Sequence, residues 1–388
     1  MIIPCRNEAD RIEFCLSSVL AQEIPDGGFE ILVADGISDD GTREIIRRMQ
    51  DGSQKAVASG QSSVVSGPAI RVIDNPGRIV STGMNAAIRA ARGQIIIRMD
   101  AHTKYAPDYI CRCLETLNQT GADNVGGPAR TRADTSMQKA NAAAYHSPFS
   151  AGGARFHDIS YAGYVDTVTY GCWPRSTFEK FGLFDEELVR NQDDEHNLRI
   201  INGGGRIWQN PKIKSWYQPR ASLTGLFTQY LQYGYWKVRV MQKHKRLASW
   251  RHLVPAAFLL TLALLFLLSA FCFLLSAFSS GQWSVVSGQP RPFSFQLSAF
   301  SLSASSAVSH FCFLLSAFCF ISLLSAYALA VLAASGLTAA KTQWRLFWIL
   351  PFVFPCYHFG YGYGFLRGIW DFVIRRKGPR KAFGTLTR

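Results

Sequence analysis

The sequence changes character near residue 250, and this change limits the fold more than any other feature. Residues 1–250 mix charged and apolar side chains, whereas residues 253–278 contain no charged side chain and residues 311–334 form a second such run. Each run exceeds the ~20 apolar residues that carry a helix across a bilayer, so buried core helices are the less favoured alternative. We expect a soluble domain over residues 1–250, a membrane region over 251–366 and a basic cytoplasmic tail over 367–388.

The charge distribution agrees with a membrane protein. The formal net charge is +14, and basic residues gather on both sides of the apolar runs. Such flanks are typical of cytoplasmic juxtamembrane segments, and no nucleic-acid-binding motif competes with that interpretation, so we expect no nucleic-acid partner. Residues 347–365 are a third apolar stretch, interrupted by Pro351 and Pro355. Because all the basic flanks favour one side, we expect two spans followed by a re-entrant or interfacial segment.

The cysteines and two repeated segments indicate the redox environment and the presence of insertions. The nine cysteines form no CxxC pair, which favours a reduced cytosolic face without disulfides or a zinc site. Residues 59–67 recur almost unchanged at 280–288, and Leu-Ser-Ala-Phe recurs within residues 268–320. We interpret these segments as low-complexity insertions, one of them near residues 52–68. The first apolar strand begins at Met1 with fewer residues than a central strand usually has, so we expect it to be truncated.

Residues 1–250 alternate short apolar runs with helical patterns, which indicates an α/β fold with a mainly parallel sheet and flanking helices. Strands are expected at 30–35, 69–73 and 94–100, and helices at 41–49 and 81–92. Two of the expected strands end in Asp35 and Asp100. Ligands of open α/β sheets gather at the carboxyl ends of strands, so both carboxylates are candidate ligand-binding groups.

Three acidic groups carry the candidate chemistry. Asp35 is placed to accept hydrogen bonds from a nucleoside, whereas Asp40 suits helix capping equally well. Asp100 and His102 share one face of an extended segment, where a carboxylate and an imidazole could hold a divalent ion together with a diphosphate. The run Asp193-Asp194-Glu195 concentrates negative charge where a base is wanted, although a solvated helix start would look the same.

Together these segments resemble family 2 glycosyltransferases, which carry the GT-A fold. The resemblance rests on residues 2–8, on the segment from Asp35 to residue 42, and on Asp100-Ala101-His102 at the place of the family's Asp-x-Asp motif. It continues through residues 171–175 and 181–186 to Asp193, where Gln192 replaces the Glu of a Glu-Asp pair. Residues 232–236 loosely resemble the Gln-x-x-Arg-Trp motif but lack its arginine. The details are similar to the succinoglycan-biosynthesis, ExoA-like branch.

The resemblance implies a role for each matching residue. Asp193 would be the catalytic base of an inverting transfer, and Asp100 with His102 would bind Mn²⁺ or Mg²⁺. The implied donor-binding residues are Pro4, Arg6, Glu8, Asp35, Asp40 and Asp100. The implied acceptor-side residues are Gly171, Trp173, Asp194, Glu195 and Trp236.

The implied enzyme lies in a bacterial inner membrane with its catalytic domain facing the cytoplasm. It would move a sugar, expected to be glucose from UDP-glucose, onto a lipid-linked saccharide acceptor in exopolysaccharide assembly. Two alternatives stay open on the sequence. One is a polyprenyl-phosphate sugar synthase, and the other is an inactive paralogue or misassembled gene product.

Overall fold

The computed structural model describes residues 1–58, 68–246, 249–280 and 295–384 of the chain. Of the insertion expected near residues 52–68, residues 59–67 lie outside these residues, as does much of the second copy of that segment. The strands of the central sheet are β1 (Ile2–Cys5), β2 (Ile31–Asp35), β3 (Ile70–Asp74), β4 (Ile95–Ile97), β6 (Asn124–Gly127), β7 (Gly163–Tyr164), β8 (Thr169–Pro174) and β9 (Ile207–Gln209).

The sheet consists of two blocks. One block has the order β1-β2-β3 and the other the order β4-β8-β6-β9-β7. A parallel bridge between Ile2 and Arg98 connects β1 to the end of β4. Strands β1, β2 and β3 run parallel, whereas β8 runs antiparallel to β4 and β6. The carboxyl ends of β1 and β2, at Cys5 and Asp35, therefore lie side by side.

Helices and a small second sheet surround this sheet in the first part of the described chain. They are α1 (Ile12–Leu20), α2 (Thr42–Ala58), α3 (Val80–Ala90), α4 (Tyr109–Thr120), α5 (Ser136–Tyr145), α6 (Pro148–Ala151), α7 (Arg175–Phe181) and α8 (Gln192–Asn202), with β5 (Thr103–Tyr105) pairing β10 (Ser215–Tyr217) and a 3-10 turn η1 (Arg155–His157).

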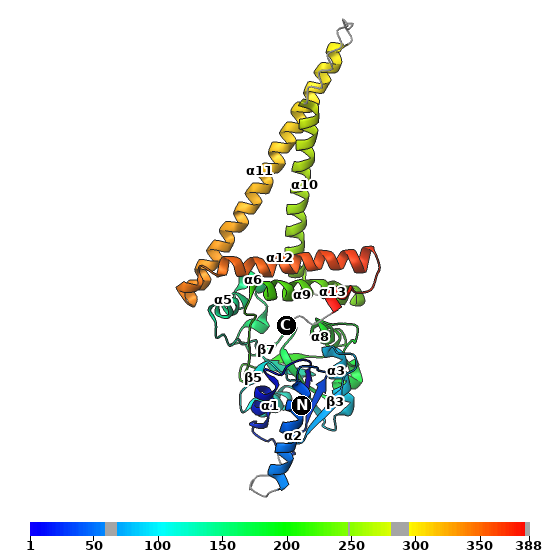
Figure 1. Ribbon diagram of the computed structural model, residues 1–388, viewed down its shortest axis with the longest axis vertical. Helices are drawn as coiled ribbons and strands as arrows, with labels where there is room; N and C mark the ends of the chain where they lie inside the picture. Colours follow the sequence, from blue (N-terminus) through cyan, green and yellow to red (C-terminus); the bar gives the residue numbers. More distant parts are fainter. Residues whose placement is uncertain (59–67, 247–248, 281–294, 385–388) are drawn as a thin grey trace.

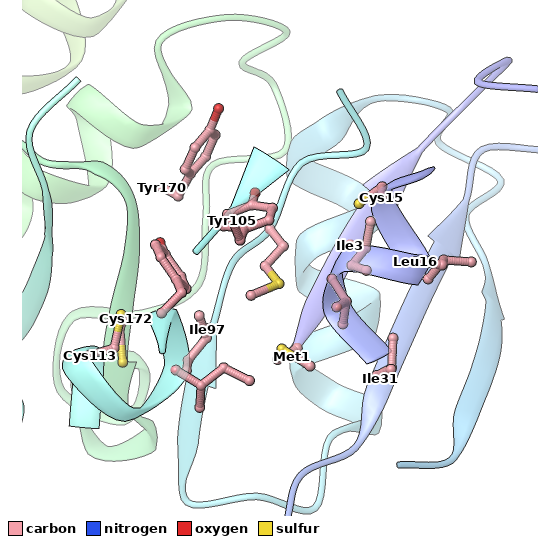
Figure 2. Packing of buried hydrophobic residues seen from close by; sticks show 14 of the residues in the cluster. Met1, Ile3, Cys15, Leu16, Ile31, Ile97, Tyr105, Cys113, Tyr170 and Cys172 are labelled. Carbon is pink, nitrogen blue, oxygen red and sulfur yellow. The ribbon is translucent and has the colours of Figure 1, made fainter. Parts of the chain in front are cut away.

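Both faces of the sheet are covered by helices, because successive strand residues point to opposite faces. Ile3 and Val33 pack with α1 and α4, and Figure 2 shows this cluster between Met1, Leu16 and Cys172. Ile2 and Leu32 instead pack with α3, α7 and α8. All four of these strand residues are fully buried. The near-continuous apolar runs of the sequence thus became strands covered on both sides.

The second half of the chain is helical. Its elements are α9 (Leu223–His244), η2 (Trp250–His252), α10 (Val254–Ser280), α11 (Phe295–Lys341), η3 (Trp344–Leu346), α12 (Leu350–Gly368), a π-helical turn η4 (Ile369–Ile374) and α13 (Lys381–Gly384). Figure 1 shows α9 and α12 lying crosswise between the sheet domain and the long pair α10 and α11.

Two helical segments, Trp250–Ser276 and Ala307–Lys341, are long and apolar enough to cross a membrane. Only 17% of the most apolar window in the first and 6% in the second is buried, whereas a core helix of a soluble protein is mostly buried. The third apolar stretch became α12, which continues as a helix through Pro355 and packs along α9 instead of extending beside α10. The expectation that this third segment is re-entrant or interfacial stays a prediction.

Candidate functional site

A cavity of about 1000 Å³ lies at the carboxyl ends of the strands and extends to the crosswise helices. On the sheet side its wall includes Pro4, Glu8, Arg98, Asp100 and His102. On the helical side it includes residues of α8, α9, η2, the start of α10, and α12. One continuous space therefore reaches from the strand ends to the start of the first candidate membrane helix.

Arg98 occupies the centre of the sheet-side wall. Its Nε and Nη2 donate to the two carboxylate oxygens of Asp100 at 2.9 and 3.1 Å, and its Nη1 donates to Asp193 at 2.5 Å. The arginine side chain is only 6% exposed. A guanidinium has the fork geometry to serve two carboxylates at once, so Arg98 connects the end of β4 to the start of α8.

Tyr170, which also lines the cavity, and Tyr105 pack against this centre. Tyr170 has a left-handed φ of 66° inside β8. Its ring lies 5.9 Å from the Arg98 guanidinium carbon. The amide of Asp100 donates to the Tyr105 hydroxyl at 2.6 Å. A non-glycine residue in this backbone region is held there by its surroundings, which is a common feature of functional sites.

The start of α8 presents two acids with different partners. Asp193 faces Arg98, and burial raises the pKa of Asp193 even though Arg98 opposes the shift. Asp194 accepts from Nζ of Lys237 on α9 at 2.6 Å. Burial alone would raise the pKa of Asp194, but Lys237 lowers it below the usual range. A carboxylate with a raised pKa is a stronger base, so Asp193 is the better candidate for accepting a proton.

His102 and Glu8 face the same cavity beside Asp100. The Nδ1 atom of His102 lies 4.0 Å from a carboxylate oxygen of Glu8, and Glu8 is 6% exposed. Within the described residues no group of three or more His, Cys, Asp or Glu gathers as a metal site. Asp100 and His102 supply oxygen and nitrogen donors that suit Mn²⁺ or Mg²⁺, but further ligands would have to come from a bound molecule.

The loop after β2 holds the expected nucleoside-binding acids outside the cavity wall. Asp35 is fully buried, accepts from Ser38 Oγ at 2.5 Å and forms an ion pair with Arg43, whose Nε lies 3.1 Å from a carboxylate oxygen. Asp40 accepts from the Ala9 amide at 3.1 Å and from the Thr42 amide at 3.0 Å. The carboxylate of Asp40 therefore ties the loop after β1 to the first turn of α2, which corresponds to the capping alternative.

Several expected acceptor-side residues pack around the cavity instead of lining it. Trp173 is 2% exposed among Phe178 and Phe184, and a Cβ on Gly171 would lie 2.4 Å from its ring. Trp236 is fully buried and its indole donates to the Phe383 carbonyl at 3.0 Å. Arg6 also lies outside the lining, beside Gly36.

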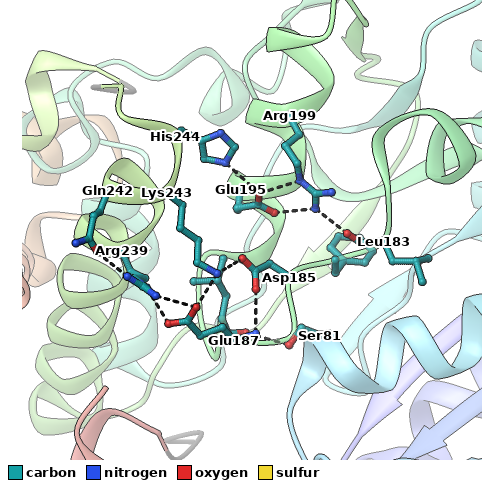
Figure 3. Close-up of polar contacts among 12 residues, drawn as sticks. Ser81, Leu183, Asp185, Glu187, Glu195, Arg199, Arg239, Gln242, Lys243 and His244 are labelled. Carbon is teal, nitrogen blue, oxygen red and sulfur yellow. Dashed lines mark hydrogen bonds and ion pairs between the residues drawn. The ribbon is translucent and has the colours of Figure 1, made fainter. Parts of the chain in front are cut away.

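Glu195 belongs to a layer of ion pairs behind α8, which Figure 3 shows. It accepts from Arg199 at 2.8 Å and from His244 of α9 at 3.0 Å, and it is 3% exposed. In the same layer Arg239 and Lys243 of α9 pair with Glu187, and Lys243 also pairs with Asp185. These contacts fix the loop before α8 to the crosswise helix α9.

The sequence did not identify Arg98, Lys237 or Arg251 as parts of the site. In the sequence, Arg98 is a cation within an apolar expected strand, two positions before Asp100. A charged residue at a position expected to be buried usually has a partner of opposite charge, and this signal could have identified Arg98 as part of the site. Lys237 and Arg251 were hidden among the basic residues that precede the membrane region.

Residues 1–175 match the model of the family described as "Glycosyl transferase family 2". The chain is 32% identical over 259 residues to the succinoglycan biosynthesis protein ExoA of Rhizobium meliloti, covering 66% of this chain and 74% of that protein. It is 28% identical over 268 residues to a dolichyl N-acetyl-alpha-D-glucosaminyl phosphate 3-beta-D-2,3-diacetamido-2,3-dideoxy-beta-D-glucuronosyltransferase of Methanococcus voltae, covering 68% and 79%.

The fold has a counterpart among solved structures. The mannosyltransferase PcManGT of Pyrobaculum calidifontis, in complex with GDP-Man and Mn²⁺, aligns with a TM-score of 0.52 over 95% of this chain and 86% of that one. The sequences are 16% identical, so the likeness concerns the fold. It extends over the catalytic half and the helices that follow.

Proposed function

We propose a function from the fact that this chain belongs to glycosyl transferase family 2. The proposed reaction is an inverting transfer of a sugar from a nucleotide-diphosphate donor to a lipid-linked saccharide. The donor is proposed to be UDP-glucose and the process exopolysaccharide biosynthesis at the cytoplasmic face of a bacterial inner membrane. ExoA, named for succinoglycan biosynthesis, supports the process, and the M. voltae transferase, named for a dolichyl phosphate sugar, supports the acceptor class.

One observation carries the proposal. Asp100 at the strand end and Asp193 at the start of α8 are held by the same buried arginine, on the wall of a cavity that continues to the start of the first candidate membrane helix. The strand-end side of this cavity suits a donor, and the helical side suits an acceptor arriving from a membrane. The two reactants would meet at Asp193.

The proposed chemistry is a single in-line displacement. Asp193 takes the proton of the acceptor hydroxyl as that oxygen attacks the anomeric carbon, and the nucleoside diphosphate departs from the opposite side. Arg98 holds the Asp193 carboxylate in a fixed direction, so alignment contributes to the rate. Pro4, Arg6, Glu8, Asp35 and Asp40 are the proposed donor-side residues.

Asp100 and His102 are the proposed protein ligands of a divalent ion, Mn²⁺ or Mg²⁺. When bound, such an ion neutralises negative charge on a diphosphate. PcManGT, which shares the fold, is described in complex with Mn²⁺. Asp194 is proposed as an acceptor-side residue because it lines the cavity next to Lys237.

The function is tested with radiolabelled UDP-glucose in membranes that contain the full chain, with manganese, magnesium or EDTA. Label is expected in the lipid extract only with a divalent ion. Asp193→Asn is expected to lower transfer by at least a thousandfold while donor binding persists, because the amide accepts no proton. Asp26→Asn, an exposed carboxylate outside the cavity, is the matched control. Unchanged turnover in Asp193→Asn would refute the base assignment.

A further inference from the structure

The end of the cavity farthest from the strands is formed by the start of the first candidate membrane helix. Trp250, Arg251, His252, Val254 and Pro255 line it together with Tyr361 of α12. The candidate span begins at Trp250. The cavity therefore opens where the chain would enter a bilayer.

The side chains at this opening indicate its depth. Trp250 is 73% exposed, although it is a large aromatic residue. Tryptophan at the end of a membrane helix usually lies among lipid headgroups, and an arginine beside it keeps its charge in the same layer. Beside Trp250, Arg251 would lie at the depth of lipid phosphates, and it lines the same cavity as Asp193.

This end of the cavity carries an excess of positive charge. Arg190, Lys237, Arg246 and Arg251 line it, and the acids facing them are Asp166 and Asp194. Asp193, the remaining acid of α8 on the wall, is already held by Arg98. The surplus of cations suits an anionic group on the ligand.

Arg251 forms a more exposed ion pair than Lys237 does. Lys237 is 8% exposed and pairs with Asp194 at 2.6 Å, so its removal would disturb α8. Arg251 is 28% exposed and pairs through Nη2 with Asp166 at 2.9 Å, and that carboxylate is 57% exposed. An exposed ion pair is weak, so a phosphate could replace Asp166 at little cost and receive two parallel hydrogen bonds from the guanidinium.

We propose that Arg251 binds the phosphate of a lipid-linked ligand at headgroup depth. The inference rests on the proposed function, since that ligand would be the acceptor, and it adds where its phosphate lies. The lipid chain would leave past Val254 and Pro255, and the sugar would extend along the cavity toward Asp193. The phosphate and the reacting hydroxyl would thus be held at opposite ends of one cavity.

The test is equilibrium binding of radiolabelled geranylgeranyl diphosphate to the full chain in phosphatidylcholine nanodiscs, without donor or metal. Arg251→Gln is expected to weaken binding about tenfold, the loss of one charge-assisted contact. Asp166→Asn is expected to tighten binding several-fold because it removes the competing carboxylate. Arg345→Gln, an exposed arginine next to Trp344 outside the cavity, is expected to change nothing and controls for surface charge.

Two competitors identify the group that is recognised. Geranylgeraniol, which lacks the phosphates, is expected to compete at least tenfold more weakly than unlabelled geranylgeranyl diphosphate. Inorganic diphosphate is expected to compete weakly as well, because it lacks the chain. Equal competition by either compound would overturn the proposal, and so would equal weakening by Arg251→Gln and Arg345→Gln.

If Arg251→Gln does not fold, Asp166→Asn tests the proposal instead. Unchanged or weaker binding of geranylgeranyl diphosphate by Asp166→Asn would contradict the proposal. The assay measures binding and involves no sugar transfer, so its result can be interpreted even if the protein has no transferase activity. Transfer to a lipid-linked acceptor without any phosphate-dependent binding would instead overturn the Arg251 site and keep the transferase.

Discussion

At Arg98 a single guanidinium balances two carboxylates that come from different elements. Its three hydrogen bonds to Asp100 and Asp193 lie in an almost fully buried position. Breaking a buried pair by removing one partner is costly because the remaining charges lose their compensation. Here two like charges would remain facing one another, so the arginine determines where Asp193 points.

Arg98→Gln is expected to lower kcat about a hundredfold, because Asp193 loses its orienting cation and a misplaced base is slow. Arg98→Lys keeps the charge without the fork and is expected to recover part of kcat. Donor dissociation constants, measured separately by equilibrium binding, are expected to change less than kcat. Equal kcat in Arg98→Gln and the wild-type protein would show that Asp193 needs no such support.

His196 is expected to make the stability of the catalytic domain depend on pH. It is fully buried on α8 against Trp173, Phe178 and Phe184, and its Nε2 contacts the Gly182 carbonyl at 3.0 Å. Burial, with a smaller contribution from Arg199, lowers the pKa of His196 to about 4. The unfolded chain then binds the proton more tightly than the folded chain, so acid favours unfolding.

For this histidine alone, the free energy of unfolding is expected to fall by about 2 kcal/mol between pH 7 and pH 5. His196→Gln keeps an N–H donor but does not titrate, so its stability is expected to depend less on pH. The measurement is the denaturation midpoint of both proteins at the two pH values. Other histidines contribute equally to both and cancel in the comparison. Parallel pH curves would mean that His196 is not the responsible group.

At the scale of elements, the contact between α9 and α12 depends on glycines. A Cβ on Gly234 would lie 2.1 Å from the Tyr361 carbonyl oxygen, and one on Gly364 would lie 2.0 Å from that of Leu231. The two backbones therefore approach too closely for any side chain at these points. Because α9 also carries Lys237, this contact connects the crosswise helix α12 to the wall of the site.

Gly364→Ala is expected to destabilise the protein by at least about 2 kcal/mol, because the added methyl group meets backbone rather than a movable side chain. The thermal unfolding midpoint in detergent is the measurement. Gly336→Ala on α11 is the matched control, since nothing lies within 4 Å of its Cβ position. The control should be neutral or slightly stabilising. If both substitutions left the midpoint unchanged, the close approach of α9 and α12 would be wrong.

The elements that the sequence predicted well are those whose signal is local. Strands expected at 30–35 and 69–73 became Ile31–Asp35 and Ile70–Asp74, because buried parallel strands are apolar runs ended by polar residues. The GT-A fold and the family were confirmed. The α9–α12 contact was not foreseen, since the sequence does not show which backbone faces the glycines of α12. Likewise, the pairing of Arg98 with Asp193 was not foreseen, since Asp193 lies 95 residues further along the chain.

The roles assigned to the site residues stay predictions. Only some of these residues line the cavity. Pro4, Glu8, Asp100, His102, Asp193 and Asp194 line the cavity, whereas Glu195, Trp173 and Trp236 pack behind it. A run of three acids does not reveal which member faces inward. On a helix, consecutive side chains point about 100° apart, so only neighbouring elements decide this.

At the scale of the whole molecule, exposed tryptophans gather in the layer between the sheet domain and the long helices. Trp250, Trp344, Trp348 and Trp370 are 73%, 66%, 77% and 47% exposed. They belong to η2, η3, the turn before α12 and η4, all next to the crosswise layer in Figure 1. Large apolar side chains at such exposure favour a lipid headgroup region as their surroundings.

This arrangement predicts which tryptophans lipids can reach. In nanodiscs containing lipids brominated near the glycerol end of their acyl chains, Trp348→Phe is expected to lower the quenched fraction of tryptophan emission, because it removes an accessible emitter. Trp208→Phe in β9 removes an emitter packed against Tyr164 in the sheet domain, so the quenched fraction should rise. Opposite signs from two identical substitutions exclude a general change in emission. A higher quenched fraction in Trp348→Phe would place the bilayer away from α12, and the cavity would then open to water instead of lipid.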